Sequence, residues 1–108
     1  MIIRTELEAT RGVVQLIGRF DAHEAAAFRR AVQPLLTSGR SVIRLDLSQV
    51  AFVDSTALAE LVRLHKAAHA IGATVVLGEL SDPVRVILEI TDLAGIFAVD
   101  TDARAEQP

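Results

Sequence analysis

The segment "SVIRLDLSQVAFVDSTALAELVRL" (residues 41–64) changes its hydrophobic pattern in the middle. Apolar and polar residues alternate as far as Leu47, which is typical of a strand with one buried face. After Asp54-Ser55-Thr56, apolar residues recur at helical spacing, at Ala57, Leu61 and Leu64. The segment therefore predicts a strand and then a core-facing helix from about Ser55 to Ile71, with an acid and two hydroxyls at the joint.

The flanking sequence predicts the remaining elements. The segments "IIRTEL" and "VVQLIG" favour a hairpin of two short strands, and Asp21 with Glu24 resembles a capping box at the start of an amphipathic helix. Pro34 should kink or loosen the last turn of that helix, because it lacks an N–H group. The segment "ATVVLG" favours a strand, "SDPVRVILEI" a helix with Pro83 in its first turn, and "GIFAVD" a last short strand.

The order of these elements is β-β-α-β-α-β-α-β, which is typical of an α/β domain. Two successive strand–helix–strand units predict parallel pairs with right-handed crossovers, and the opening hairpin adds an antiparallel edge. We therefore expect one domain over residues 1–100, with a mixed, mostly parallel sheet and amphipathic helices. The polar tail, residues 101–108, lacks apolar anchors and is expected to fray.

Composition excludes several classes of protein. The 108-residue chain is 51% hydrophobic but only 4% aromatic, so its core must be aliphatic, and it has no cysteine for a disulfide or thiolate site. A net charge of −3 argues against nucleic-acid binding, which normally needs a basic face. No apolar run approaches the roughly 20 residues of a membrane span, and the N-terminus does not resemble a secretory signal. We expect a cytoplasmic protein without membrane insertion.

The joint at residues 54–56 has two explanations that the residues alone leave open. Asp, Ser and Thr are all strong helix N-cap residues, worth about 1 kcal/mol. A phosphate on Ser55 would also suit the site, because free N–H groups and the helix dipole favour an anion there. Such a phosphate adds about −1.5 to −2 charges at neutral pH, which a docked partner would feel.

Catalytic and metal-binding alternatives have weaker support. His65 and His69 have the spacing of zinc peptidases, but Lys66 stands where the catalytic Glu is required. Ser55 lies in no Gly-x-Ser-x-Gly elbow that would mark a hydrolase nucleophile. We therefore expect no enzymatic activity, no metal and no cofactor.

The chain resembles the STAS domain family, which includes bacterial anti-sigma factor antagonists. "GRFDAHEAAAFRRAV" (residues 18–32) is similar to the family's Gly-x-x-Asp and first helix, and "VIRLDLSQVAFVDSTALAEL" (residues 42–61) to its core strand and Asp-Ser-[Ser/Thr]-Gly-Leu motif. "AIGATVVLGELSDPVRVILEITDLAGIF" (residues 70–97) is similar to its later strand and terminal pattern. The second stretch is the specific one, and the others gain weight from their order.

The resemblance implies a phosphorylation-gated binding module. In stand-alone members the unphosphorylated form binds an anti-sigma factor that is also a serine kinase, and so frees the sigma factor. Phosphorylation of the serine after the motif's Asp, here Ser55 with Thr56 as runner-up, abolishes binding until a phosphatase removes the phosphate. We expect a monomer whose partner surface comprises Asp21, Ala22, His23, Asp54, Ser55, Thr56, Ala57, Leu58, Glu60, Arg63 and Lys66, the last three as exposed positions of the helix.

Two departures from the family pattern bear on this expectation. Ala57 and Ala59 stand where glycines are common, which favours the helix by about 1 kcal/mol each but adds methyl groups near a docking kinase. Arg19 stands at a position that is often acidic, and suggests a different partner or a pairing with a bound phosphate. The alternative function is that of a STAS subunit in a lipid-transporting ABC complex, or another STAS protein-interaction module.

Overall fold

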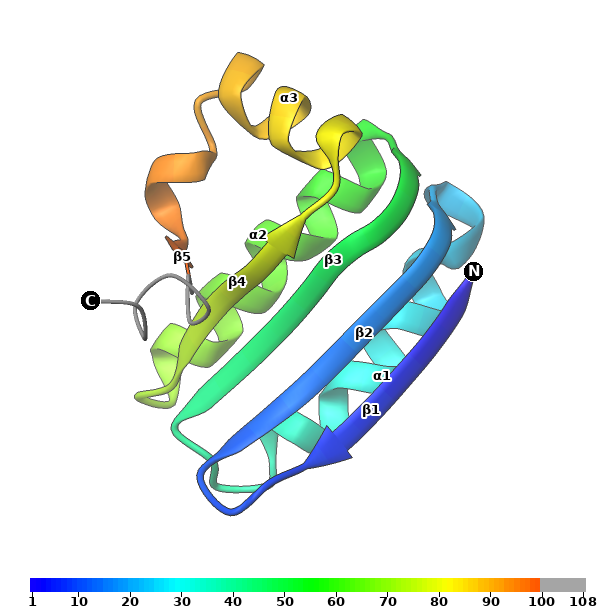
Figure 1. Cartoon of the computed structure of the whole chain (residues 1–108). Coiled ribbons are helices and arrows are strands. Elements are labelled where there is room, and N and C mark those ends of the chain that lie inside the picture. Colours follow the sequence, from blue (N-terminus) through cyan, green and yellow to red (C-terminus); the bar gives the residue numbers. More distant parts are fainter. Residues whose placement is uncertain (100–108) are drawn as a thin grey trace, which may run out of the picture.

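The computed structural model describes residues 1–99. Five strands of this part of the chain form one mixed sheet in the order β1-β2-β3-β4-β5 (Figure 1). The antiparallel pair is β1 (Ile2–Leu7) with β2 (Arg11–Phe20). The strands β3 (Val42–Val53), β4 (Thr74–Leu80) and β5 (Ala98–Val99) continue the sheet in parallel from β2. The predicted fold class and element order are thereby confirmed.

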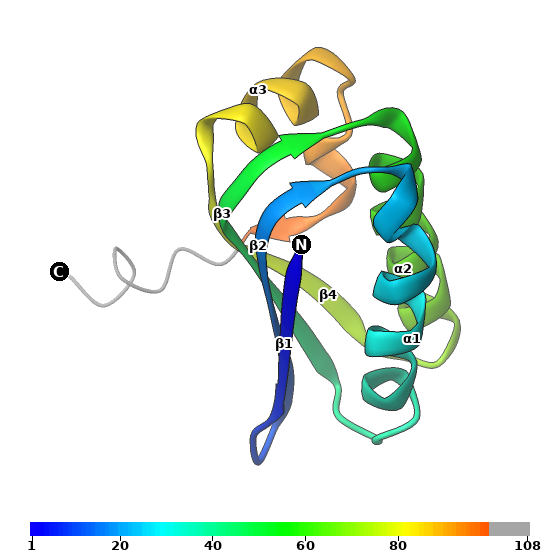
Figure 2. The same ribbon diagram turned by 90° about the vertical axis from the view of Figure 1, so that its right-hand side faces the viewer.

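Two long helices cover one face of the sheet. Helices α1 (Ala25–Leu36) and α2 (Ser55–Ala70) lie side by side on that face, as Figure 2 shows. The third helix, α3 (Asp82–Ile90), follows the carboxyl end of β4 and packs against β3. The joint between β3 and α2 therefore lies at the carboxyl edge of the parallel strands, where α/β folds collect functional groups.

The core lies between the sheet and the α1–α2 layer. The alternation expected from residue 41 onward is present, because Ile43, Leu45 and Leu47 of β3 are at most 1% exposed. Matching residues of β2 and β4 complete the layer, and Phe28 of α1 packs on Phe20 with ring centroids 4.9 Å apart. The core is mostly aliphatic, as the low aromatic content predicts.

The start of α1 differs from expectation in two ways. A 3₁₀ turn (Ala22–Glu24) precedes α1, and Asp21 accepts a hydrogen bond from the His23 amide at 3.1 Å. Glu24 does not return to Asp21 as in a capping box, because its carboxylate lies 3.8 Å from the Met1 amino group. Pro34 lies inside α1, two residues before its end, and the kink or loosening expected there stays a prediction.

The C-terminal boundaries follow the sequence more closely. Helix α2 ends at Ala70, and Gly72 adopts the positive φ of 79° that terminates it. The last strand is short, and Asp100 and the tail at 101–108 lie outside the described residues. Within the described chain no helix has the length and apolar character needed to span a membrane.

Truncation of Phe28 tests the core. Phe28 is fully buried, so Phe28→Ala is expected to lower the free energy of unfolding by about 3–5 kcal/mol. Ile90→Ala is the control, because Ile90 is 73% exposed and should change stability by less than about 0.5 kcal/mol. Urea denaturation followed by circular dichroism measures both, and similar losses would contradict the packing described.

Candidate functional site

Asp54 joins two segments that are far apart in the sequence. It is the N-cap of α2, and its Oδ1 accepts a hydrogen bond from the Ala57 amide at 2.9 Å. Its Oδ2 accepts a second hydrogen bond from the Ala22 amide at 3.0 Å. One carboxylate therefore satisfies a free donor at the start of α2 and fixes the segment that follows β2 beside it.

The side chain of Ser55, unlike that of Asp54, takes no part in capping α2. It is the first residue of α2 and is exposed, and the described part of the chain supplies no hydrogen-bond partner for its hydroxyl. The capping explanation of the joint is thus correct for Asp54, whose side chain performs it. The hydroxyl of Ser55 remains accessible at the positive end of the helix dipole, and the neighbouring Thr56 is also exposed.

The end of β2 carries a second charged contact beside the joint. Arg19 Nε lies 3.9 Å from Asp21 Oδ2, and the guanidinium carbon lies 4.0 Å from the centre of the Phe52 ring. Stacking on an aromatic face is a favourable position for a guanidinium. Arg19 is therefore held by Asp21 and Phe52, and remains 63% exposed.

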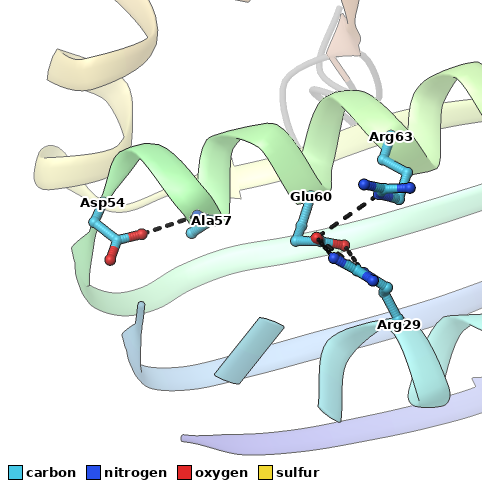
Figure 3. A network of polar contacts seen from close by, with 5 residues as sticks. All are labelled: Arg29, Asp54, Ala57, Glu60 and Arg63. Atoms are coloured by element: carbon cyan, nitrogen blue, oxygen red, sulfur yellow. Dashed lines mark hydrogen bonds and ion pairs between the residues drawn. The ribbon is translucent and has the colours of Figure 1, made fainter. Parts of the chain in front are cut away.

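The expectation that Glu60 is exposed is wrong. Its side chain is only 3% exposed, and Arg29 of α1 donates three hydrogen bonds of 2.7–2.9 Å to the two carboxylate oxygens (Figure 3). Arg63 Nε lies 3.7 Å from the same carboxylate. Glu60 faces the neighbouring helix because Arg29 of α1 lies opposite it. The sequence of α2 alone does not reveal this arginine, which is why exposure was expected.

This ion pair sets the charge state of Glu60. Hydrogen bonds from Arg29, aided by its charge and by that of Arg63, lower the pKa of the Glu60 carboxyl, although burial acts in the opposite direction. Glu60 in turn raises the pKa of Arg29. The pair is ionised at neutral pH and links α1 to α2.

Two further residues of the expected partner surface are buried. Ala57 is fully buried and Leu58 is 7% exposed, because both lie on the side of α2 that continues through Leu61 and Leu64 into the core. The partner surface expected from the sequence is thus divided by the structure. Its exposed members are Ala22, His23, Ser55, Thr56, Arg63 and Lys66.

An open groove runs along the exposed side of α2. Its volume is about 620 Å³, and it extends along a stripe of α2 toward the segment after α3; the lining residues are Ser55, Leu58, Ala59, Val62, Arg63, Lys66 and Leu93. Helical spacing in the sequence could have placed Ala59 and Val62 beside Ser55. Leu93 could not be found in this way, because it reaches the groove only through the tertiary fold.

The two histidines of α2 make ordinary packing contacts. The centroids of the His65 and Phe97 rings lie 5.5 Å apart in a T-shaped arrangement, and those of His65 and His69 lie 6.3 Å apart. Across residues 1–99, no group of three or more metal-ligating side chains is suitably placed.

A sequence model of the family described as "Mlab, STAS domain" matches residues 3–99. The chain belongs to the STAS domain family. The anti-sigma-B factor antagonist of Listeria monocytogenes is 32% identical to this STAS domain over 82 residues, which is 76% of this chain and 72% of the relative. The same protein of Listeria innocua matches equally well.

Solved structures share the fold of this STAS domain. A Thermotoga maritima protein matches with a TM-score of 0.83 at 24% identity, covering 95% of this chain and 90% of that one. The unphosphorylated anti-sigma factor antagonist SpoIIAA matches with a TM-score of 0.80 at 18% identity, over 96% and 92% of the two chains. Phosphorylated SpoIIAA from Bacillus matches with a TM-score of 0.73 at 18% identity, over 96% of each chain.

Replacement of Glu60 tests the link between α1 and α2. Glu60→Gln is expected to lower the free energy of unfolding by about 1–3 kcal/mol at pH 7, because a neutral amide accepts weaker hydrogen bonds from Arg29 than the buried carboxylate of Glu60 does. Since the folded pKa of Glu60 lies below its ordinary value of 4.5, the wild-type advantage is complete above that value and is lost as pH falls through the folded pKa.

Urea denaturation at several pH values measures this difference. The control is Glu89→Gln on the exposed side of α3, which should have little effect. A wild-type advantage that does not depend on pH would contradict the ionised pair.

Replacement of Asp54 tests the double cap. Asp54→Ala removes both amide acceptors and is expected to lower the free energy of unfolding by about 1–2 kcal/mol. Asp54→Asn keeps one carbonyl acceptor and should lose less. Hydrogen exchange of the Ala22 and Ala57 amides should quicken in Asp54→Ala, and unchanged exchange at Ala22 would show that the contact with Asp54 Oδ2 does not protect it.

Proposed function

We propose that this STAS domain is an anti-sigma factor antagonist whose binding is switched off by phosphorylation of Ser55. The main support is the accessible hydroxyl of Ser55 at the first position of α2, where Asp54 already caps the helix. The naming of the Listeria relatives as anti-sigma-B factor antagonists supports the class of function. SpoIIAA, solved in both forms, offers a precedent in this fold for a phosphorylated state.

The fold is suited to carry a phosphate at this place. Amide groups at the start of α2 and the helix dipole favour an anion on Ser55. Asp54 and Asp21 lie nearby and their charges oppose the added one, but both carboxylates are already engaged by amides. The added charge therefore acts mainly on a protein docked over the joint, and repulsion of about 1.4 kcal/mol weakens its binding tenfold.

The proposed cycle needs no catalysis by this protein. The unphosphorylated form binds an anti-sigma factor with serine kinase activity, and the sigma factor is released. The kinase then modifies Ser55 and binding is lost, until a phosphatase restores the hydroxyl. We propose that this occurs in the cytoplasm and that the antagonist acts as a monomer.

Substitution of Ser55 tests the switch. The binding partner in this assay is a candidate anti-sigma factor with serine kinase activity, and calorimetric titration gives the affinity. Ser55→Ala should bind as wild type does, whereas Ser55→Asp should bind at least about tenfold more weakly because it carries a charge at the helix start. Equal affinity of all three would argue for an unmodified docking module, as in an ABC transporter subunit.

The acceptor is identified by intact mass after incubation with that kinase and ATP. Wild type should gain one phosphate and Ser55→Ala none. Modification of Ser55→Ala together with its absence in Thr56→Ala would move the acceptor to Thr56. No modification of wild type would refute phosphorylation by this kinase.

A further inference from the structure

The two helices on the sheet carry the opposite charge from the chain as a whole. The protein has a net charge of −3. Four basic side chains lie on α1 and α2, and Glu60 is the single acid of these two helices; the four are Arg29, Arg30, Arg63 and Lys66. The α1–α2 layer is therefore a basic surface on an acidic protein.

The contacts of Glu60 decide where this positive charge is exposed. Arg29 occupies both carboxylate oxygens with hydrogen bonds of 2.7–2.9 Å. Arg63 approaches the same carboxylate only to 3.7 Å, which is too long for a hydrogen bond, and it is 64% exposed. Figure 3 shows the two arginines meeting on one carboxylate. One negative charge cannot neutralise two positive ones, and the surplus lies at Arg63.

The groove along α2 places this charge next to an apolar wall. In the order along α2, Ser55 comes first among the lining residues, Leu58, Ala59 and Val62 follow, and Arg63 and Lys66 come last; Leu93 adds a further apolar side chain. Ser55 and Lys66 are separated by about 17 Å of helix. A bound segment would thus meet apolar contacts and cations within a few turns.

We infer that the groove docks an acidic amphipathic segment of the anti-sigma factor, with apolar side chains against Val62 and Leu93 and carboxylates against Arg63 and Lys66. This inference rests on the proposed function and adds the chemistry of the partner. Charge complementarity favours it, since an acidic segment would be attracted by the basic layer and repelled by the rest of the protein. An amphipathic helix in an apolar groove is a common form of recognition.

The same electrostatics connects docking to the switch. A phosphate on Ser55 would place about two negative charges at the end of a groove that receives an acidic segment. Charges within about 8–10 Å act on one another at physiological salt. The repulsion therefore acts on acidic side chains of the occupant that lie near Ser55, and only weakly on those held by Arg63 and Lys66 at the far end of the groove, with no change in the fold.

The probes are two synthetic peptides of about 14 residues, long enough for a helix that spans the groove. Both carry leucines at i, i+3, i+4 and i+7, and their remaining positions are Glu in one and Lys in the other. Titration into ¹⁵N-labelled protein, followed by amide shifts, gives site and affinity. The Glu peptide should shift the amides around Ala59, Val62 and Leu93, and should bind roughly tenfold more tightly than the Lys peptide.

Charge reversal supplies the matched variants. Arg63→Glu and Lys66→Glu should each weaken binding of the Glu peptide roughly fivefold, and the double variant should prefer the Lys peptide. Arg30→Glu is the control, because it makes the same change of charge at an exposed position of α1 that does not line the groove. Its effect should be less than about twofold. Circular dichroism confirms that each variant is folded.

Three results would overturn the inference. Equal binding of the two peptides, or none of either, would show that the groove does not select acidic segments. An equal loss in Arg30→Glu would show attraction by overall charge alone. Shifts confined to the apolar groove of Phe52 and Val86, between the end of β3 and α3, would place docking elsewhere. All three leave the Ser55 titration with the kinase unaffected, so the two proposals fail separately.

Discussion

The two hydrogen bonds accepted by Asp54 hold the functional end of this domain together. One carboxylate oxygen caps α2 and the other holds the amide of Ala22. These contacts bring residues 32 positions apart in the sequence to one edge of the sheet. Because Asp54 supplies the cap, Ser55 can be modified without loss of the interaction that starts the helix. This division of work between two adjacent residues would allow the proposed switch to lie at a structurally important position.

The ion pair of Glu60 with Arg29 has a comparable role nearly two turns further along α2. It joins the two helices of the layer, and it consumes the negative charge that would otherwise neutralise Arg63. Structural and electrostatic roles are thus combined in one buried carboxylate. The resulting surface is basic along α2 and carries the proposed acceptor at the start of that helix.

Local pattern was sufficient to predict the fold. Alternation in residues 42–47 and helical spacing after Asp54 mark the central strand and helix, and Gly72 marks the end of α2. The first turns before α1 were less predictable, because Glu24 pairs with the amino group of Met1, which precedes β1. At the site, the burial of Glu60 and the position of Leu93 in the groove could not be predicted from local sequence either. Whether a carboxylate is buried, or a leucine lines a groove, depends on elements that meet only in the folded chain.

The contact between Asp54 and Ala22 is made to the backbone amide, and this has an evolutionary consequence. Any residue except proline provides that amide, while the side chains of Ala22 and His23 point into solvent. Copies of this STAS domain can therefore diverge at these two positions and keep the joint intact. If the proposed partner surface includes these two positions, paralogues that differ there would differ in partner choice and still keep the contact between Asp54 and the Ala22 amide.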